Sequence, residues 1–197
     1  MPQIAEIKAR SNRLNEIRKY LKDQNARYKG TDHQIDTYFK VQAGRLKLRQ
    51  GNVETNLIYY SRPNTAAPKK SEVLLYQPVD SSDLKTILNK VHDTLCIVDK
   101  VREIYFIDNV KFHLDTVQGL GTYVEIEAID ETNELEYDII LEQCNGYMTE
   151  LKIDDTDLIS VSYSDMIVQQ MQSAWRAIIQ QKYCFSASTP YCLAHLP

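Results

Sequence analysis

The sequence has few cysteines, and they do not form a recognisable framework. Four cysteines occur in 197 residues, with no CxxC pair and no histidine partner at zinc-site spacing. This scarcity argues against a disulfide scaffold and favours a reduced, intracellular protein. No apolar run approaches the roughly 18 residues of a membrane span, and the amino terminus lacks an apolar signal core. The sequence therefore predicts a cytoplasmic protein with no membrane partner.

Neither sign of charge is in large excess over the whole chain, but the charges are unevenly distributed. Lys and Arg number 23 against 27 Asp and Glu, so the net charge of −4 excludes a histone-like polycation or an acidic disordered tail. Up to Gln50, twelve basic residues oppose five acidic ones, a net +7. From Glu125 to Asp157, one basic residue opposes twelve acidic ones, a net −11. Such an asymmetry needs an explanation beyond solubility.

Hydrophobic periodicity predicts a single α+β domain over residues 1–182, followed by a tail, 183–197, to which we assign no role. Period-two alternation indicates strands and helical spacing indicates helices. Strands are expected at about 3–10, 33–41, 45–50, 55–62, 72–78, 95–107, 109–117 and 121–129. Helices are expected at about 12–30, 82–91, 132–149 and 162–182. Short turns between strands favour an antiparallel eight-stranded sheet curled into a β-barrel, with helices packed outside.

Charged residues lie on common strand faces and are sorted by sign. Side chains at i and i+2 of a strand point the same way, so each of the following groups shares a face. The groups are Glu6, Lys8 and Arg10; Arg45, Lys47 and Arg49; Tyr60 and Arg62; Lys100 and Arg102; His113 and Asp115; and Glu125 and Glu127. A solvated outer face is one interpretation, because antiparallel sheets often alternate polar-out and apolar-in. Surface faces usually mix signs, however, so the sorting favours a polar barrel interior.

Basic walls facing one acidic wall suit a polyanion bound together with a divalent metal ion. Phosphate oxygens accept charge-assisted hydrogen bonds from Lys and Arg, and Arg can bind them in a bidentate manner. Mg²⁺ or Mn²⁺ takes hard oxygen ligands, which carboxylates and phosphate both supply. Two roles are open for His113: a general base, or a structural residue that hydrogen-bonds beside Asp115. We favour the structural role.

Several motifs, taken in order, resemble the CYTH family, also called triphosphate tunnel metalloenzymes. This family includes class IV adenylate cyclases, thiamine triphosphatases and inorganic triphosphatases, and the first of these branches is the most similar. The resemblance covers about residues 3–168. Its motifs are Glu6-Ile7-Lys8-Ala9-Arg10, Gln34 to Phe39, Gly44 to Arg49, Leu57 to Pro63, Lys100-Val101-Arg102, His113-Leu114-Asp115, Gly119 to Glu127 and Leu158 to Asp165.

The resemblance implies a barrel whose lumen holds a triphosphate and its metal. Glu6 and Lys8 match the second Glu and the Lys of the ExExK signature, and Lys8 is the expected catalytic residue. Ile4 stands where the signature has its first Glu, so one family ligand is missing. The expected phosphate-binding residues are Lys8, Arg10, Arg45, Lys47, Arg49, Arg62, Lys100 and Arg102. The expected ligands of Mg²⁺ or Mn²⁺ are Glu6, Asp115, Glu125 and Glu127.

The function implied by the resemblance is metal-dependent phosphohydrolysis of a triphosphate such as tripolyphosphate, thiamine triphosphate or ATP. Two alternatives stay open: a class IV adenylate cyclase that releases cyclic AMP and pyrophosphate from ATP, and a non-catalytic barrel that binds nucleotide or polyphosphate. We favour the hydrolase because no nucleoside-binding motif is visible. Nucleic acid is not expected as a partner, because the cations share faces with Glu pairs. Whether the chain forms a homodimer stays open.

Overall fold

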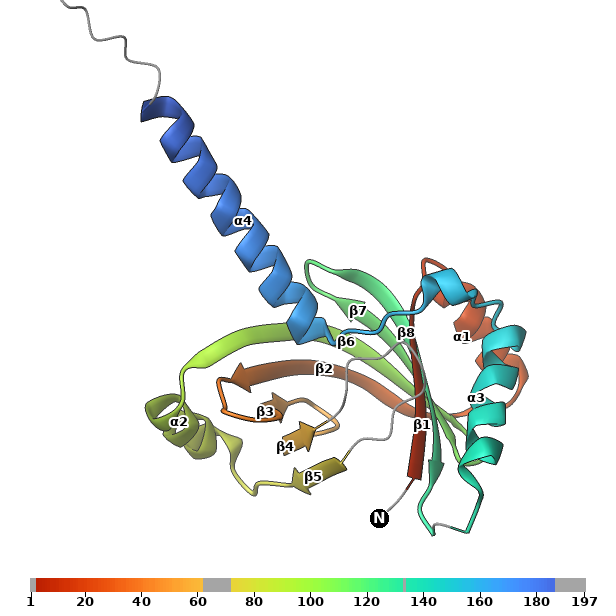
Figure 1. The fold of residues 1–197 in the computed structure, drawn as a ribbon. Helices are drawn as coiled ribbons and strands as arrows, with labels where there is room; N and C mark the ends of the chain where they lie inside the picture. The colour runs from red at the N-terminus through yellow and green to blue at the C-terminus, as the bar shows by residue number, and fades with distance from the viewer. Residues whose placement is uncertain (1–2, 62–71, 133, 187–197) are drawn as a thin grey trace, which may run out of the picture.

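The computed structural model describes residues 3–61, 72–132 and 134–186, which form a curled antiparallel sheet with helices around it (Figure 1). The strands are β1 (Gln3–Arg10), β2 (Arg27–Phe39), β3 (Arg45–Gln50), β4 (Asn56–Ser61), β5 (Glu72–Tyr76), β6 (Thr94–Ile107), β7 (Val110–Val117) and β8 (Gly121–Asp130). Their order in the sheet is β1-β8-β7-β6-β2-β3-β4-β5. The eight-stranded antiparallel fold is therefore confirmed. No ladder joins β1 to β5 in the described residues, so the sheet is an open half-barrel.

Four α-helices lie on the outside of the sheet: α1 (Leu14–Asp23), α2 (Ser81–Val91), α3 (Tyr137–Glu150) and α4 (Tyr163–Ser186), with a short 3₁₀ turn, η1 (Asp155–Asp157), before α4. Helices α1 and α3 cover the convex face of β1 and β8, whereas α4 runs outward from β6 (Figure 1). Within the described part of the chain, none of these helices has the length and apolarity needed to cross a bilayer.

The sheet has its apolar face outward and its charged face inward. Ile7 of β1, Phe112 of β7 and Ile126 of β8 are buried in one cluster with Ile17 and Leu21 of α1. Alternate residues of the same strands consequently point to the concave face. Several of these charged residues are buried rather than solvated: Lys8, Arg49, Lys100, Arg102 and Glu125 are each 8% exposed or less. The solvated-face interpretation is therefore wrong for these positions.

The main error in the predicted boundaries lies between the first helix and the second strand. The expected helix extended to Gly30, but α1 ends at Asp23 and β2 already begins at Arg27. Asn25 has a φ of 56°, a left-handed conformation that ends a helix. The long β6 strand then pairs with Arg27 and the residues after it, so tertiary pairing decides the structure of this segment. A second boundary also differs: the helix predicted at 132–149 begins only at Tyr137.

Candidate functional site

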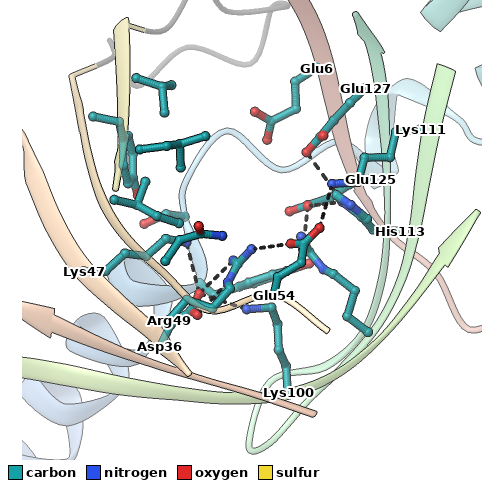
Figure 2. Close-up of a pocket in the computed structure, with 18 of the residues that line it drawn as sticks. Glu6, Asp36, Lys47, Arg49, Glu54, Lys100, Lys111, His113, Glu125 and Glu127 are labelled. Carbon is teal, nitrogen blue, oxygen red and sulfur yellow. Dashed lines mark hydrogen bonds and ion pairs between the residues drawn. The ribbon is translucent and has the colours of Figure 1, made fainter. Parts of the chain in front are cut away.

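The concave face of the half-barrel encloses a cavity of about 460 Å³ into which charged side chains of six strands project (Figure 2). Cations line it from β1, β2, β3, β6 and β7, and carboxylates line it from β1, β2 and β8. The predicted site residues that line the cavity are Glu6, Lys8, Lys47, Arg49, Lys100, Arg102, Glu125 and Glu127. Their convergence follows from strand alternation combined with the curl of the sheet.

Strand register brings the acidic residues of β8 beside β1 and β7. Glu125 lies opposite Lys8 on one side and opposite His113 on the other. The Lys8 Nζ is 3.0 Å from one Glu125 oxygen, and His113 Nδ1 is 3.2 Å from the other. Glu127 lies between Glu6 and Lys111 in the next inward-facing row. These rows are set by the β7–β8 hairpin, whose positive-φ glycine at Gly119 permits the tight turn.

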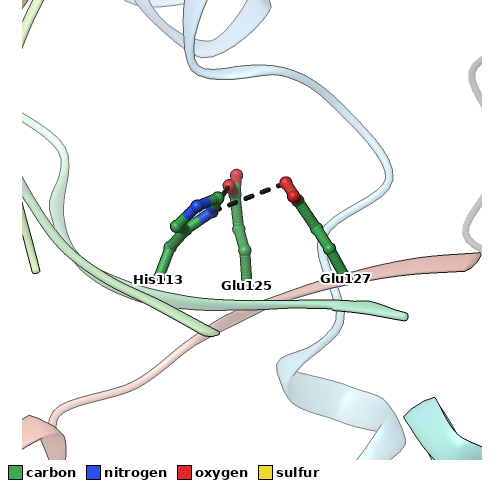
Figure 3. A group of neighbouring side chains, drawn as sticks. All are labelled: His113, Glu125 and Glu127. Atoms are coloured by element: carbon green, nitrogen blue, oxygen red, sulfur yellow. Dashed lines mark hydrogen bonds and ion pairs between the residues drawn. The ribbon is translucent and has the colours of Figure 1, made fainter. Parts of the chain in front are cut away.

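His113, Glu125 and Glu127 together form a group that fits a metal ion (Figure 3). One potential ligand atom from each lies within 4.8 Å of the others. The buried Nε2 of His113 has no hydrogen-bond partner in the described residues. Burial, followed by the nearby Arg102, lowers the pKa of His113, so its imidazole is held neutral and able to donate a lone pair. Carboxylate oxygens with one imidazole nitrogen are a ligand set for a divalent cation.

Arg102 links the group formed by His113, Glu125 and Glu127 to the buried carboxylate of Asp115. Its guanidinium donates to both oxygens of Asp115 and, at 2.6 Å, to Glu125. Burial alone would raise the pKa of Glu125, but Arg102 and Lys8 hold that pKa well below its usual range. Asp115 is fully buried, accepts a further hydrogen bond from the Tyr163 hydroxyl at 2.8 Å, and is not among the residues lining the cavity. Asp115 thus orients Arg102 from behind.

A second carboxylate, Asp36 of β2, holds three of the predicted phosphate-binding cations (Figure 2). It lies 3.0 Å from Lys47 Nζ and 2.9 Å from Lys100 Nζ, and it accepts two hydrogen bonds from Arg49. Burial would raise the pKa of Asp36, but Lys47, Lys100 and Arg49 keep it well below the ordinary value. Three cations on one carboxylate leave a net positive cluster, which suits a polyanion.

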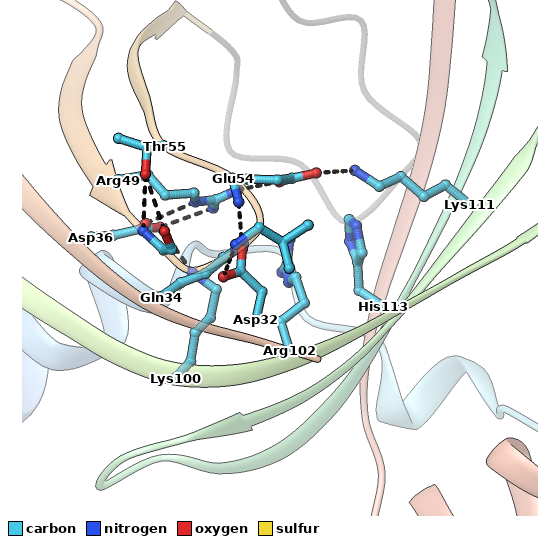
Figure 4. Close-up of polar contacts among 12 residues, drawn as sticks. Asp32, Gln34, Asp36, Arg49, Glu54, Thr55, Lys100, Arg102, Lys111 and His113 are labelled. Carbon is cyan, nitrogen blue, oxygen red and sulfur yellow. Dashed lines mark hydrogen bonds and ion pairs between the residues drawn. The ribbon is translucent and has the colours of Figure 1, made fainter. Parts of the chain in front are cut away.

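The turn between β3 and β4 contributes another carboxylate, Glu54, to the lining of the cavity (Figure 4). Glu54 is 3.2 Å from Lys29, 3.3 Å from Arg49 and 3.5 Å from Lys111. Burial opposes its ionisation, but Lys111 and Arg49 lower the pKa of Glu54 to about 2. Buried Asp32 fixes this turn by accepting hydrogen bonds from the backbone N–H groups of Val53 and Glu54.

Three predicted site residues do not line the cavity, and a fourth lies outside the residues that the structure describes. Arg10 is exposed and donates to the Leu120 carbonyl, and Arg45 pairs with Asp165 at 2.9 Å. Neither is among the lining residues, nor is Asp115. Arg62 lies outside the described residues. Strand parity placed Arg10, Arg45 and Asp115 on the correct face but could not give their positions along it.

The structure also adds residues that sequence reasoning missed: Asp36, Glu54, Lys111 and, as a member of the candidate metal-binding group, His113. His113 could have been found from the hairpin register that places it opposite Glu125. Asp36 lies two residues before Tyr38 on the same strand and so faces the same side, which is only a weak indication that it belongs to the site. Glu54 lies in a turn with no periodicity, so only the three-dimensional structure identifies it.

Comparison with known proteins gives consistent relationships. The CYTH domain family matches residues 3–163. A protein of Methanocaldococcus jannaschii that carries a provisional adenylate cyclase name is 25% identical over 173 residues, covering 82% of this chain and 96% of its own length. The solved PH1012 protein of Pyrococcus horikoshii OT3 has a TM-score of 0.70 at 22% identity, covering 82% of this chain and 98% of its own.

A further solved structure, the Hippeastrum protein HpAC1, has a TM-score of 0.61 at 15% identity, covering 86% of this chain and 96% of its own. A dominant triphosphatase activity is described for that protein. At these identities the solved structures establish the fold, whereas the family match spans most of the sequence. The motifs, the half-barrel and the domain match agree, and the chain belongs to the CYTH domain family.

Proposed function

We propose that this protein is a metal-dependent phosphohydrolase that cleaves the terminal phosphate of a triphosphate bound in the cavity. One observation carries the proposal: seven cations and the His113, Glu125 and Glu127 group line the same cavity. The cations are Lys8, Lys29, Lys47, Arg49, Lys100, Arg102 and Lys111. Phosphoryl transfer depends mainly on positioning and on neutralising charge, and this combination of groups can do both.

Each part of the cavity has a defined task under this proposal. Lys47, Arg49 and Lys100 bind the phosphate chain, and Lys8 and Arg102 neutralise charge near the acidic residues of β8. His113, Glu125 and Glu127 would hold Mg²⁺ or Mn²⁺, and Glu6 lies opposite Glu127 on the neighbouring strand. When bound, such an ion polarises phosphoryl oxygens and assists the attack of water. Asp115 and Asp36 keep the guanidinium and ammonium groups oriented.

The proposal is tested by measuring phosphate released from tripolyphosphate, thiamine triphosphate and ATP with Mg²⁺ or Mn²⁺. Metal-dependent release from at least one of them is expected, and EDTA should abolish it. No turnover of any triphosphate would contradict the hydrolase and leave the non-catalytic barrel as the better hypothesis.

Adenylate cyclase activity is the second candidate, which the provisional name of the M. jannaschii relative favours. In that reaction the ribose 3′-hydroxyl attacks the α-phosphorus and pyrophosphate leaves. Chromatography of the products formed from ATP distinguishes the two reactions directly. Orthophosphate with ADP supports hydrolysis, whereas cyclic AMP with pyrophosphate supports cyclisation.

Triphosphate binding should weaken with rising pH because of Lys100. Burial, opposed by Asp36, lowers the pKa of Lys100 to about 7, so its charge is present below that pH and is lost above it. Bound triphosphate favours the charged form, so affinity should fall by up to about tenfold per pH unit above 7. Lys100→Arg stays charged and should lack this component.

The measurement is calorimetric titration of tripolyphosphate into metal-free protein between pH 6 and 8.5. Ionisation of the ligand affects both proteins equally, so the ratio of wild-type to Lys100→Arg affinity isolates the lysine. Parallel affinity curves for the two proteins would contradict this assignment.

A further inference from the structure

Helix α4 carries an apolar stripe that continues beyond the body of the protein. Near the start of the helix, Ile167 and Val168 pack against a buried cluster that includes Val98 of β6. The helix then runs outward from the sheet (Figure 1). Along the same helix face, at the spacing of an amphipathic helix, the stripe continues with Met171, Trp175, Ile178 and Ile179.

The outer part of this stripe is exposed to solvent. The exposed fractions are 57% for Met171, 65% for Trp175, 51% for Ile178 and 39% for Ile179. Every residue from 169 to 181 is exposed, a length of about 20 Å of helix. Helices of this length are marginal in water on their own, because most helical stability comes from packing of the apolar face. Within the described residues, the outer part of α4 lacks that packing.

The polar positions of α4 indicate what kind of surface fits the stripe. Between Met166 and Gln181 the only charged residue is Arg176, and the other polar residues are glutamine and serine. Helices that lie on a membrane usually carry many Lys and Arg residues on the polar face, and contacts with a different protein usually gain specificity from opposite charges. Glutamine side chains both donate and accept hydrogen bonds, so two identical faces can pair without charge repulsion. The surface is therefore self-complementary, as a two-fold contact requires.

We propose that the stripe of α4 binds the same stripe of a second copy of this chain, so that two copies form a two-fold dimer through Met171, Trp175 and Ile178. Trp175 lies at the middle of the exposed stretch 169–181, and large aromatic residues at the centre of an interface usually provide most of the binding energy. Two such stripes bury on the order of 1,000 Å² in total, the lower limit for a specific interface. The dimer should therefore be reversible, with a dissociation constant on the order of micromolar.

Trp175 is the only tryptophan in the sequence, so its fluorescence reports directly on this surface. We expect sedimentation velocity to show monomer at about 0.1 µM and dimer at about 200 µM. The emission maximum of Trp175 should move to shorter wavelength over the same range, because the indole becomes buried. A chain that stays monomeric throughout would overturn the inference. A dimer with unchanged Trp175 emission would also overturn it, because that dimer would use a different surface.

Ile178 and Gln180 supply a matched pair of variants, because two residues of a helix that are two positions apart lie on nearly opposite faces. Ile178→Glu places an unpaired charge within the stripe and should weaken the dimer by at least about tenfold. Gln180→Glu adds the same charge to the opposite face and should leave the dissociation constant within about threefold of wild type. Glutamate is a good helix former, so neither substitution breaks α4 itself. Equal weakening in the two variants would overturn the inference.

A membrane is the alternative occupant that the same fluorescence can test. Vesicles of phosphatidylcholine, with and without phosphatidylserine, should leave the Trp175 emission of the dilute monomer unchanged. A shift to shorter wavelength on adding vesicles would assign the stripe to a lipid surface and overturn the dimer. The inference does not rest on the proposed function, because Met171, Trp175 and Ile178 are not among the residues that line the cavity. Phosphate release and dimer formation are measured separately, so either can fail alone.

Discussion

Glu127→Gln is expected to reduce metal-dependent phosphate release by roughly 100- to 1,000-fold, because a metal ion contributes several kcal/mol to phosphoryl transfer. Glu127 is one of three residues whose ligand atoms lie within 4.8 Å of one another. The amide keeps the size of the side chain but removes the negative charge that a hard cation requires. Affinity for Mn²⁺, measured by calorimetry without substrate, should fall in parallel.

Glu127 is a sharper test than Glu125 because the two carboxylates have different surroundings. The Glu125 side chain contacts Lys8, Arg102 and His113, and it is almost fully buried. Its removal would leave buried cations unpaired and would destabilise the fold. The Glu127 side chain is 21% exposed, so Glu127→Gln should alter the free energy of unfolding by no more than about 1 kcal/mol.

The matched control is Glu131→Gln, which removes an exposed carboxylate just beyond the end of the same strand. It should leave turnover and Mn²⁺ affinity unchanged. If Glu127→Gln also retained both, Glu127 would not be a metal ligand. If it lost turnover but kept Mn²⁺ affinity, the carboxylate would act on substrate rather than on metal.

Strand patterning predicted much of this architecture because alternation and turn positions are local properties. The strand at 45–50 agrees with β3, and the parity of Lys47 and Arg49 correctly placed both on the inner face. The hairpin between β7 and β8 also fixes which residues lie opposite one another. Local patterns therefore predicted both the sheet and the side of it that carries charge.

Local patterns could not give the depth of a side chain or its partner. Asp115 has the parity expected of a metal ligand, yet it lies behind Arg102 and binds that guanidinium. Glu54 reaches Lys111 across the sheet from a turn, at a sequence separation that no periodicity can reveal. Pairing between distant strands decides both contacts. The least predictable part of the site was thus the acidic groups that hold its cations.

Asp36→Asn is expected to lower the free energy of unfolding by about 3–5 kcal/mol, the typical cost of removing one partner from a buried ionic group. Asp36 is 1% exposed and contacts Lys47, Arg49 and Lys100, so the substitution leaves three cations without their shared carboxylate. Asparagine preserves the shape of the side chain but not its charge. Denaturant unfolding monitored by circular dichroism measures the effect.

The control is Asp32→Asn, a buried carboxylate on the same face of β2 whose hydrogen bonds come from backbone N–H groups and Gln34. These donors are uncharged, so the loss of their hydrogen bonds should cost less, about 1–3 kcal/mol. A loss in Asp36→Asn that is no greater than in this control would contradict the central ionic role of Asp36.

The loss in Asp36→Asn should also depend on pH and on ligand. The pKa of Lys100 is already lowered to about 7, and removal of Asp36 lowers it further, so the lysine can discharge as pH rises. The contribution of Lys100 to the loss in free energy of unfolding, relative to wild type, should therefore be larger at pH 6 than at pH 8.5. Tripolyphosphate supplies the missing negative charge, so it should raise the melting temperature more in the variant than in wild type. An equal ligand-induced shift would mean that Asp36 does not neutralise the cations that bind triphosphate.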